Sequence, residues 1–107
     1  MGYNGFPRGV IDSEPRYQDK QTKYKLVSHA ESNAIAQAAR HGIRVEGSTL
    51  IVTALYPCSS CAKQIIQAGI KQVFYPHVHN PNPLWAEEWK ISQLMFNEAG
   101  IKLEEYL

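Results

Sequence analysis

The chain has 107 residues, of which 44% are hydrophobic types and 20% are charged, and its formal net charge is +1. This composition excludes a disordered chain, a collagen-like chain and a long coiled coil. A charge this small also argues against a polynucleotide partner, because such proteins usually carry a larger basic excess. Apolar runs of only a few residues predict no membrane span. The N-terminal residues lack a signal-peptide pattern, so we expect one domain over residues 1–107 in the cytoplasm.

The first half of the chain predicts loops, then a helix, then a strand. Residues 1–28 are interrupted by glycine, proline and asparagine, which favours turns. Alanines recur at helical spacing between Ala30 and Arg40, and His41-Gly42 follows as a stop. Residues 49–55 are β-branched and apolar with little alternation, which predicts a strand buried on both faces.

The second half predicts two helices alternating with two strands. A helix is expected over residues 57–68, because Pro57 favours a first turn and Gly69 a last one. Residues 72–75 predict a strand, and residues 86–98 predict a helix. Its inward-facing residues are expected to be Trp85, Trp89, Met95 and Phe96. Residues 101–106 predict an edge strand, so the alternation indicates an α/β sandwich with partly parallel strands.

Three residues have the spacing of a metal site. Cys58 and Cys61 form a Cys-x-x-Cys pair, and residues three apart on a helical turn lie on the same face. His29 precedes the first predicted helix and can supply a neutral imidazole. Two sulfurs and one nitrogen suit zinc with a fourth position open for water.

Glu31, two residues after His29, is the candidate catalytic group. A carboxylate beside the open position can accept a proton from water as it attacks a substrate. Three simpler interpretations remain open at this point. The cysteines could be a redox pair, the zinc could be structural with a further histidine as ligand, or Glu31 could only stabilise the start of a helix.

The chain resembles the deoxycytidylate (dCMP) deaminases of the zinc-dependent cytidine deaminase superfamily. The combination of H-x-E with P-C-x-x-C is typical of zinc nucleobase deaminases. The matching segments are GYNGFPRG at residues 2–9, HAESNAI at residues 29–35 and LYPCSSCAK at residues 55–63, continued by IIQAGI at residues 65–70. The first two segments favour the nucleotide-acting dCMP branch.

The resemblance implies hydrolysis of dCMP to dUMP and ammonia. Zinc would be held by His29, Cys58 and Cys61, while Glu31 would move protons to N3 of the base and to the departing amino group. The product would feed pyrimidine deoxynucleotide synthesis. Other substrates within the same chemistry are a free nucleoside, guanine or a nucleic-acid base, and a different class of function is a non-catalytic, zinc-stabilised subunit.

Four further residues are expected to contact the substrate. By the resemblance, Ala30 offers its backbone N–H to the base carbonyl and Asn4 contacts the sugar or base, although Asn4-Gly5 also reads as a plain tight turn. Arg8 is the candidate for the phosphate, since a dianion needs cationic donors. Tyr75 follows a predicted strand end, where open α/β sheets bind ligands.

The resemblance implies a cytidine-deaminase-like three-layer α/β sandwich with a mixed, partly parallel sheet. In that family a helix, a strand and most of a second strand precede the GYNG segment, which here begins at residue 2. We therefore expect one side of the sheet to lie uncovered and the chain to be a fragment, the product of a truncated or split gene, or a protein completed by a partner. Self-association into a homo-oligomer is expected. Family members respond to dCTP and dTTP, and no residue here is assigned to those effectors.

Overall fold

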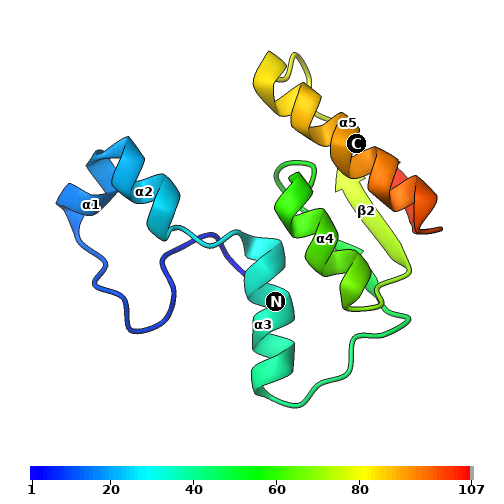
Figure 1. The fold of residues 1–107 in the computed structure, drawn as a ribbon, viewed down its shortest axis with the longest axis horizontal. Coiled ribbons are helices and arrows are strands. Elements are labelled where there is room, and N and C mark those ends of the chain that lie inside the picture. Colours follow the sequence, from blue (N-terminus) through cyan, green and yellow to red (C-terminus); the bar gives the residue numbers. More distant parts are fainter. Residues whose placement is uncertain (107) are drawn as a thin grey trace.

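The computed structural model describes residues 1–106, in which helices and strands alternate along most of the chain (Figure 1). Two short helices come first and are followed by a longer helix and then by the strands and their connecting helices. The elements are α1 (Glu14–Gln18), α2 (Lys20–Leu26), α3 (Ala30–Arg40), β1 (Thr49–Ile51), α4 (Ser59–Gln67), β2 (Gln72–Pro76), α5 (Pro83–Glu98) and β3 (Lys102–Tyr106). The predicted α/β class is confirmed.

The three strands form one parallel sheet in the order β1-β2-β3. Leu50 pairs with Val73, which pairs with Leu103. The expected mixed sheet is therefore, over residues 1–106, an entirely parallel one. The reason is that α4 and α5 are crossover connections, which return the chain to start each strand in the same direction. Antiparallel pairing is confined in this part of the chain to the bridge between Gly5 and Ser28.

The hydrophobic core lies between the sheet and the helices. Val73 of β2, Ile65 of α4 and Phe96 of α5 are completely buried against one another, and Ile35 of α3 packs on the same cluster. Figure 1 shows α3, α4 and α5 side by side on the same side of the sheet. Burying these side chains is the main source of the stability that holds α4 in place.

The opposite face of the sheet is largely exposed at its edges, as the sequence analysis leads us to expect for one side of the sheet. Ile51 is 65% exposed, and its neighbours across the sheet are Phe74 and then Glu104. The prediction of a strand covered on both faces over residues 49–55 is therefore wrong in two respects. The strand ends at Ile51, and the side chain of Ile51 is exposed instead of buried.

The segment before α3 contains helices that the turn-rich composition did not predict. Pro15 lies in the first turn of α1, where its missing N–H costs no hydrogen bond. The prediction that Pro15 interrupts regular structure is therefore wrong, because a proline in the first turn is compatible with a helix. Helices α1 and α2 pack against each other and, among the helices and strands described, against no other. Figure 1 shows them projecting to one side of the sheet and its helices.

The later helices begin at positions that differ from the prediction. Helix α4 starts at Ser59, which leaves Cys58 as its N-cap residue. Helix α5 starts at Pro83 instead of residue 86, because the side chain of Asn82 accepts a hydrogen bond from the N–H of Leu84. Trp85 in this first turn is 48% exposed, so its predicted inward orientation is wrong. No helix within residues 1–106 is both long and apolar enough to cross a membrane.

The difference in burial between Ile65 and Ile51 predicts that an isoleucine-to-alanine substitution destabilises the protein far more at the first position than at the second. Ile65→Ala should lower the free energy of unfolding by about 2–5 kcal/mol, because it leaves a cavity in the core. Ile51→Ala should cost less than about 1 kcal/mol, because the side chain is already in water. Urea unfolding of both variants measures the difference, and equal costs would contradict the one-sided core.

Candidate metal centre

Two helices begin side by side with a candidate metal ligand at each N-cap. His29 is the N-cap of α3, Cys58 is the N-cap of α4, and Cys61 lies in the first turn of α4. The sulfurs of Cys58 and Cys61 each lie 3.4 Å from Nδ1 of His29. All three potential ligand atoms lie within 4.8 Å of one another, in the one cluster of this kind found among residues 1–106.

The donor set of this cluster fits a zinc ion. Two sulfurs and one imidazole nitrogen are the ligand types that zinc prefers, and three protein ligands leave one position open. Cys61 is buried whereas His29 is exposed, so the cluster is anchored in the protein on one side and accessible to solvent on the other. This accessibility is what a catalytic site needs and what a closed four-ligand site lacks.

The side chains of Cys58 and Cys61 shift each other's pKa in opposite directions. The hydrogen bond from the Cys61 side chain, with further help from His29, lowers the pKa of Cys58 to about 5. The same hydrogen bond raises the pKa of Cys61, because its proton is held against the Cys58 sulfur. A bound metal ion must displace that proton, so metal binding and deprotonation of the pair are linked.

Glu31 lies beside the same cluster. Burial raises the pKa of its carboxyl, and this effect is opposed by the neighbouring side chains of Cys61 and His29. The catalytic role expected for Glu31 stays a prediction. A carboxylate here can exchange protons with a molecule bound at the open position.

The start of α3 is capped by Asn4. The backbone N–H of Ala30 donates to Oδ1 of Asn4 at 2.6 Å, whereas the side chain of His29 makes no capping hydrogen bond. The sequence analysis expected the Ala30 N–H and the Asn4 side chain to contact the substrate. Here they bind each other, so a base carbonyl must compete with Asn4 for the Ala30 N–H.

Asn33 and Gly2 hold the N-terminal segment against α3, and the sequence analysis assigned neither a role. Nδ2 of Asn33 donates to the carbonyl oxygens of Tyr3 at 2.6 Å and Ser28 at 3.2 Å. A Cβ atom on Gly2 would lie only 2.2 Å from the carbonyl oxygen of Ala30. The glycine that begins the GYNG segment is thus explained by close contact with the helix that carries Glu31.

Two further side chains near the cysteines were also missed. Oγ of Ser32 lies 3.5 Å from Sγ of Cys61. Glu88 of α5 accepts hydrogen bonds from the backbone N–H of Ser59, at 2.9 Å, and from its hydroxyl. No local signal could have found Glu88, because Glu87-Glu88 resembles an ordinary solvated pair on a helix.

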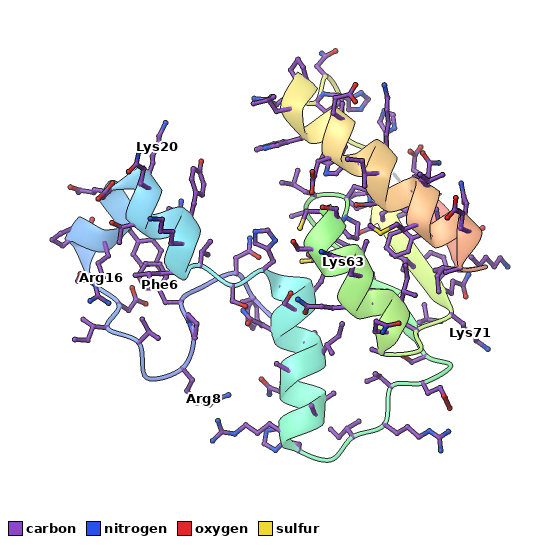
Figure 2. The ribbon with its side chains drawn as sticks, in the orientation of Figure 1. Phe6, Arg8, Arg16, Lys20, Lys63 and Lys71 are labelled. Carbon is purple, nitrogen blue, oxygen red and sulfur yellow. The ribbon has the colours of Figure 1, made fainter. Side chains whose placement is uncertain are left out.

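Among residues 1–106, no hydrogen bond or ion pair joins Arg8 or Tyr75 to the cluster. Arg8 lies on the exposed loop before α1, and Figure 2 shows it apart from the start of α4. Tyr75 on β2 packs edge-on against Tyr56, with ring centroids 4.7 Å apart. Tyr56 comes two residues before Cys58, so Tyr75 supports the loop that leads to the metal ligands.

Comparison with known proteins places the chain in a family. The model of the cytidine and deoxycytidylate deaminase zinc-binding region matches residues 2–77, which include His29, Glu31 and both cysteines. The chain belongs to the cytidine and deoxycytidylate deaminase family. The chain is 39% identical over 104 residues to an uncharacterised deaminase of Aliivibrio fischeri, covering 96% of the chain and 67% of that relative. It is 37% identical to human deoxycytidylate deaminase, covering 100% of the chain and 60% of the human protein.

The fold of the chain agrees with this assignment. A crystal structure of dCMP deaminase from the cyanophage S-TIM5, in complex with dCMP and dUMP, superposes with a TM-score of 0.74 at 28% identity. The match covers 98% of this chain and 70% of the phage chain. The chain thus spans roughly two thirds of the proteins it resembles.

The contact between Gly2 and α3 predicts a selective effect of a single methyl group. Gly2→Ala should displace the N-terminal segment and lower the free energy of unfolding by about 1–3 kcal/mol, as overpacking does. Gly5→Ala should change it by less than about 0.5 kcal/mol, because a Cβ there meets nothing within 4 Å. Thermal unfolding compares the two variants, and an unaffected Gly2→Ala protein would contradict the close packing.

Proposed function

We propose that the chain is a zinc-dependent deaminase that hydrolyses dCMP to dUMP and ammonia in the cytoplasm. The observation that carries this proposal is the cluster of His29, Cys58 and Cys61 at the starts of two helices, with Glu31 in the first turn of the helix that His29 begins. Relatives named deoxycytidylate deaminase, from human and from Enterobacteria phage T4, support the choice of substrate. The cyanophage structure with dCMP and dUMP supports it as well.

His29, Cys58 and Cys61 would hold the zinc ion. When bound, zinc polarises a water molecule, which makes the water easier to deprotonate. The carboxylate of Glu31 accepts a proton from the water that attacks C4 of cytosine and passes it to N3. A second proton travels from the same oxygen, through Glu31, to the amino nitrogen, which departs as ammonia. The ring keeps the oxygen as its new carbonyl, so the reaction balances as dCMP plus water to dUMP plus ammonia.

The proposed substrate contacts are Asn4, Ala30, Arg8 and Tyr75. Asn4 and Ala30 border the metal ligand His29, and their mutual hydrogen bond would open to admit the base. Arg8 lies on the exposed loop before α1, so its guanidinium would reach the phosphate only after that loop moves or in a homo-oligomer. Any response to dCTP or dTTP would likewise depend on surfaces outside the metal centre.

A second candidate is a zinc-stabilised subunit without activity of its own. The exposed sheet face, with Ile51 65% exposed, favours it, because apolar side chains in this position are normally covered. Both candidates require zinc at the same three residues. They differ only in whether the chain turns over a substrate.

The decisive measurement is ammonia release from dCMP by the zinc-loaded chain. We expect turnover of dCMP and a sharply weaker reaction with deoxycytidine, because the phosphate supplies charge-assisted hydrogen bonds that the nucleoside lacks. Full zinc occupancy without turnover of any cytosine or adenine nucleotide would contradict the proposed deaminase activity and favour the non-catalytic subunit.

The role of Glu31 predicts that binding and catalysis can be separated. Glu31→Gln should retain one zinc ion per chain but lose activity by about 10²- to 10⁴-fold, since the amide cannot accept and return a proton. Glu98→Gln, at an exposed position at the end of α5, serves as the control and should leave both unchanged. Metal analysis and the ammonia assay measure the two effects. Loss of zinc together with activity would show that Glu31 is a ligand instead.

A further inference from the structure

Helix α4 needs a cap that its own N-terminal residue does not supply. The first backbone N–H groups of a helix have no partner within the helix, and a serine, threonine, asparagine or aspartate at the N-cap usually accepts one. In α4 the N-cap is Cys58, whose side chain makes no capping hydrogen bond. Its sulfur faces His29 and Cys61 instead.

Glu88 of α5 takes over this function from a distant part of the chain. Oε1 of Glu88 accepts the N–H of Ser59, the first residue of α4, at 2.9 Å, and also accepts the Ser59 hydroxyl. These bonds from Ser59 lower the pKa of Glu88, so the carboxylate is the form that the site stabilises. The neighbouring Glu87 is exposed, and its partner among residues 1–106 is Lys90, at 3.3 Å.

The two hydrogen bonds to Glu88 restrain Ser59, which lies between Cys58 and Cys61 in the sequence. Ser59 is bonded to Cys58 and lies two residues before Cys61. When its N–H and its hydroxyl are both bound by one carboxylate oxygen, the first turn of α4 cannot rotate freely about its axis. The packing of Ile65 against Phe96 fixes the rest of α4 on α5, so Glu88 extends the same contact to the end that carries the sulfurs.

We propose that Glu88 is a positioning residue of the metal centre. It acts through Ser59 to hold the sulfurs of Cys58 and Cys61 close enough to Nδ1 of His29 for all three atoms to bind one metal ion. The inference rests on the proposed function, because it assumes that these three residues bind zinc. Side chains that orient metal ligands through hydrogen bonds usually raise metal affinity, and their removal weakens it. A change at Glu88 should therefore alter the geometry of the site as well as the stability of the helix.

The test uses the whole 107-residue chain and two matched pairs of variants. Glu88→Gln is compared with Glu87→Gln, and Ser59→Ala with Ser60→Ala, because Glu87 and Ser60 are exposed neighbours of the same type. Zinc affinity is measured by competition with a chromophoric chelator. The Co²⁺-loaded chain reports the geometry through its thiolate charge-transfer bands. Unfolding of the metal-free chain reports stability alone.

We expect Glu88→Gln and Ser59→Ala to weaken zinc binding by about 10- to 100-fold and to shift the cobalt bands. Ser59→Thr should restore both, because it keeps the hydroxyl. Glu87→Gln and Ser60→Ala should match the unsubstituted chain. If Glu88→Gln does not fold, the comparison of Ser59→Ala with Ser59→Thr and Ser60→Ala decides the same point.

Unchanged zinc affinity and cobalt bands in the variants would overturn the proposal, even if the metal-free chain became less stable, because Glu88 would then be only a helix cap. Failure of the unsubstituted chain to bind zinc would overturn both this inference and the proposed function. Normal zinc binding without deamination would overturn the proposed function alone, and the metal measurements would still decide the role of Glu88.

Discussion

Two of the three candidate metal ligands occupy the positions that would otherwise cap their helices, and much of the surrounding structure follows from this constraint. His29 and Cys58 are the N-cap residues of α3 and α4, and neither side chain caps its own helix. The first free N–H of each helix is instead accepted by a residue from elsewhere: Asn4 binds Ala30, and Glu88 binds Ser59. Both helix ends can therefore direct these residues at a shared metal ion while the first N–H of each helix keeps a hydrogen-bond partner.

This arrangement connects the site to segments that carry no ligand themselves. The N-terminal segment is held on α3 through Asn4 and Asn33, and α5 is held on α4 through Glu88 and the buried core. The parallel sheet makes these connections possible. Helices α4 and α5 each follow the carboxyl end of a strand, so their first turns lie at the same edge of the sheet.

Local sequence patterns predicted correctly those elements whose side-chain pattern and backbone preferences favour the same structure. Helix α3 begins and ends at the predicted residues, and the predicted metal ligands do lie together. The errors arose where the surroundings decide. Pro15 starts a helix in place of breaking one, and Trp85 is half exposed because α5 begins before it. Ile51 reads as a core residue, yet nothing among residues 1–106 covers its face of the sheet.

By itself, the sequence determined the candidate metal ligands, because residue type and the spacing of two cysteines along one helical turn are local properties. His29, Cys58 and Cys61 could be identified from the pattern alone, and they lie together in the structure. Only the tertiary structure decided how these residues are supported. The contacts of Asn4 with Ala30 and of Glu88 with Ser59 join residues 26 and 29 positions apart. These contacts depend on which helix ends lie next to each other at the edge of the sheet. No periodicity or motif along the chain predicts that proximity.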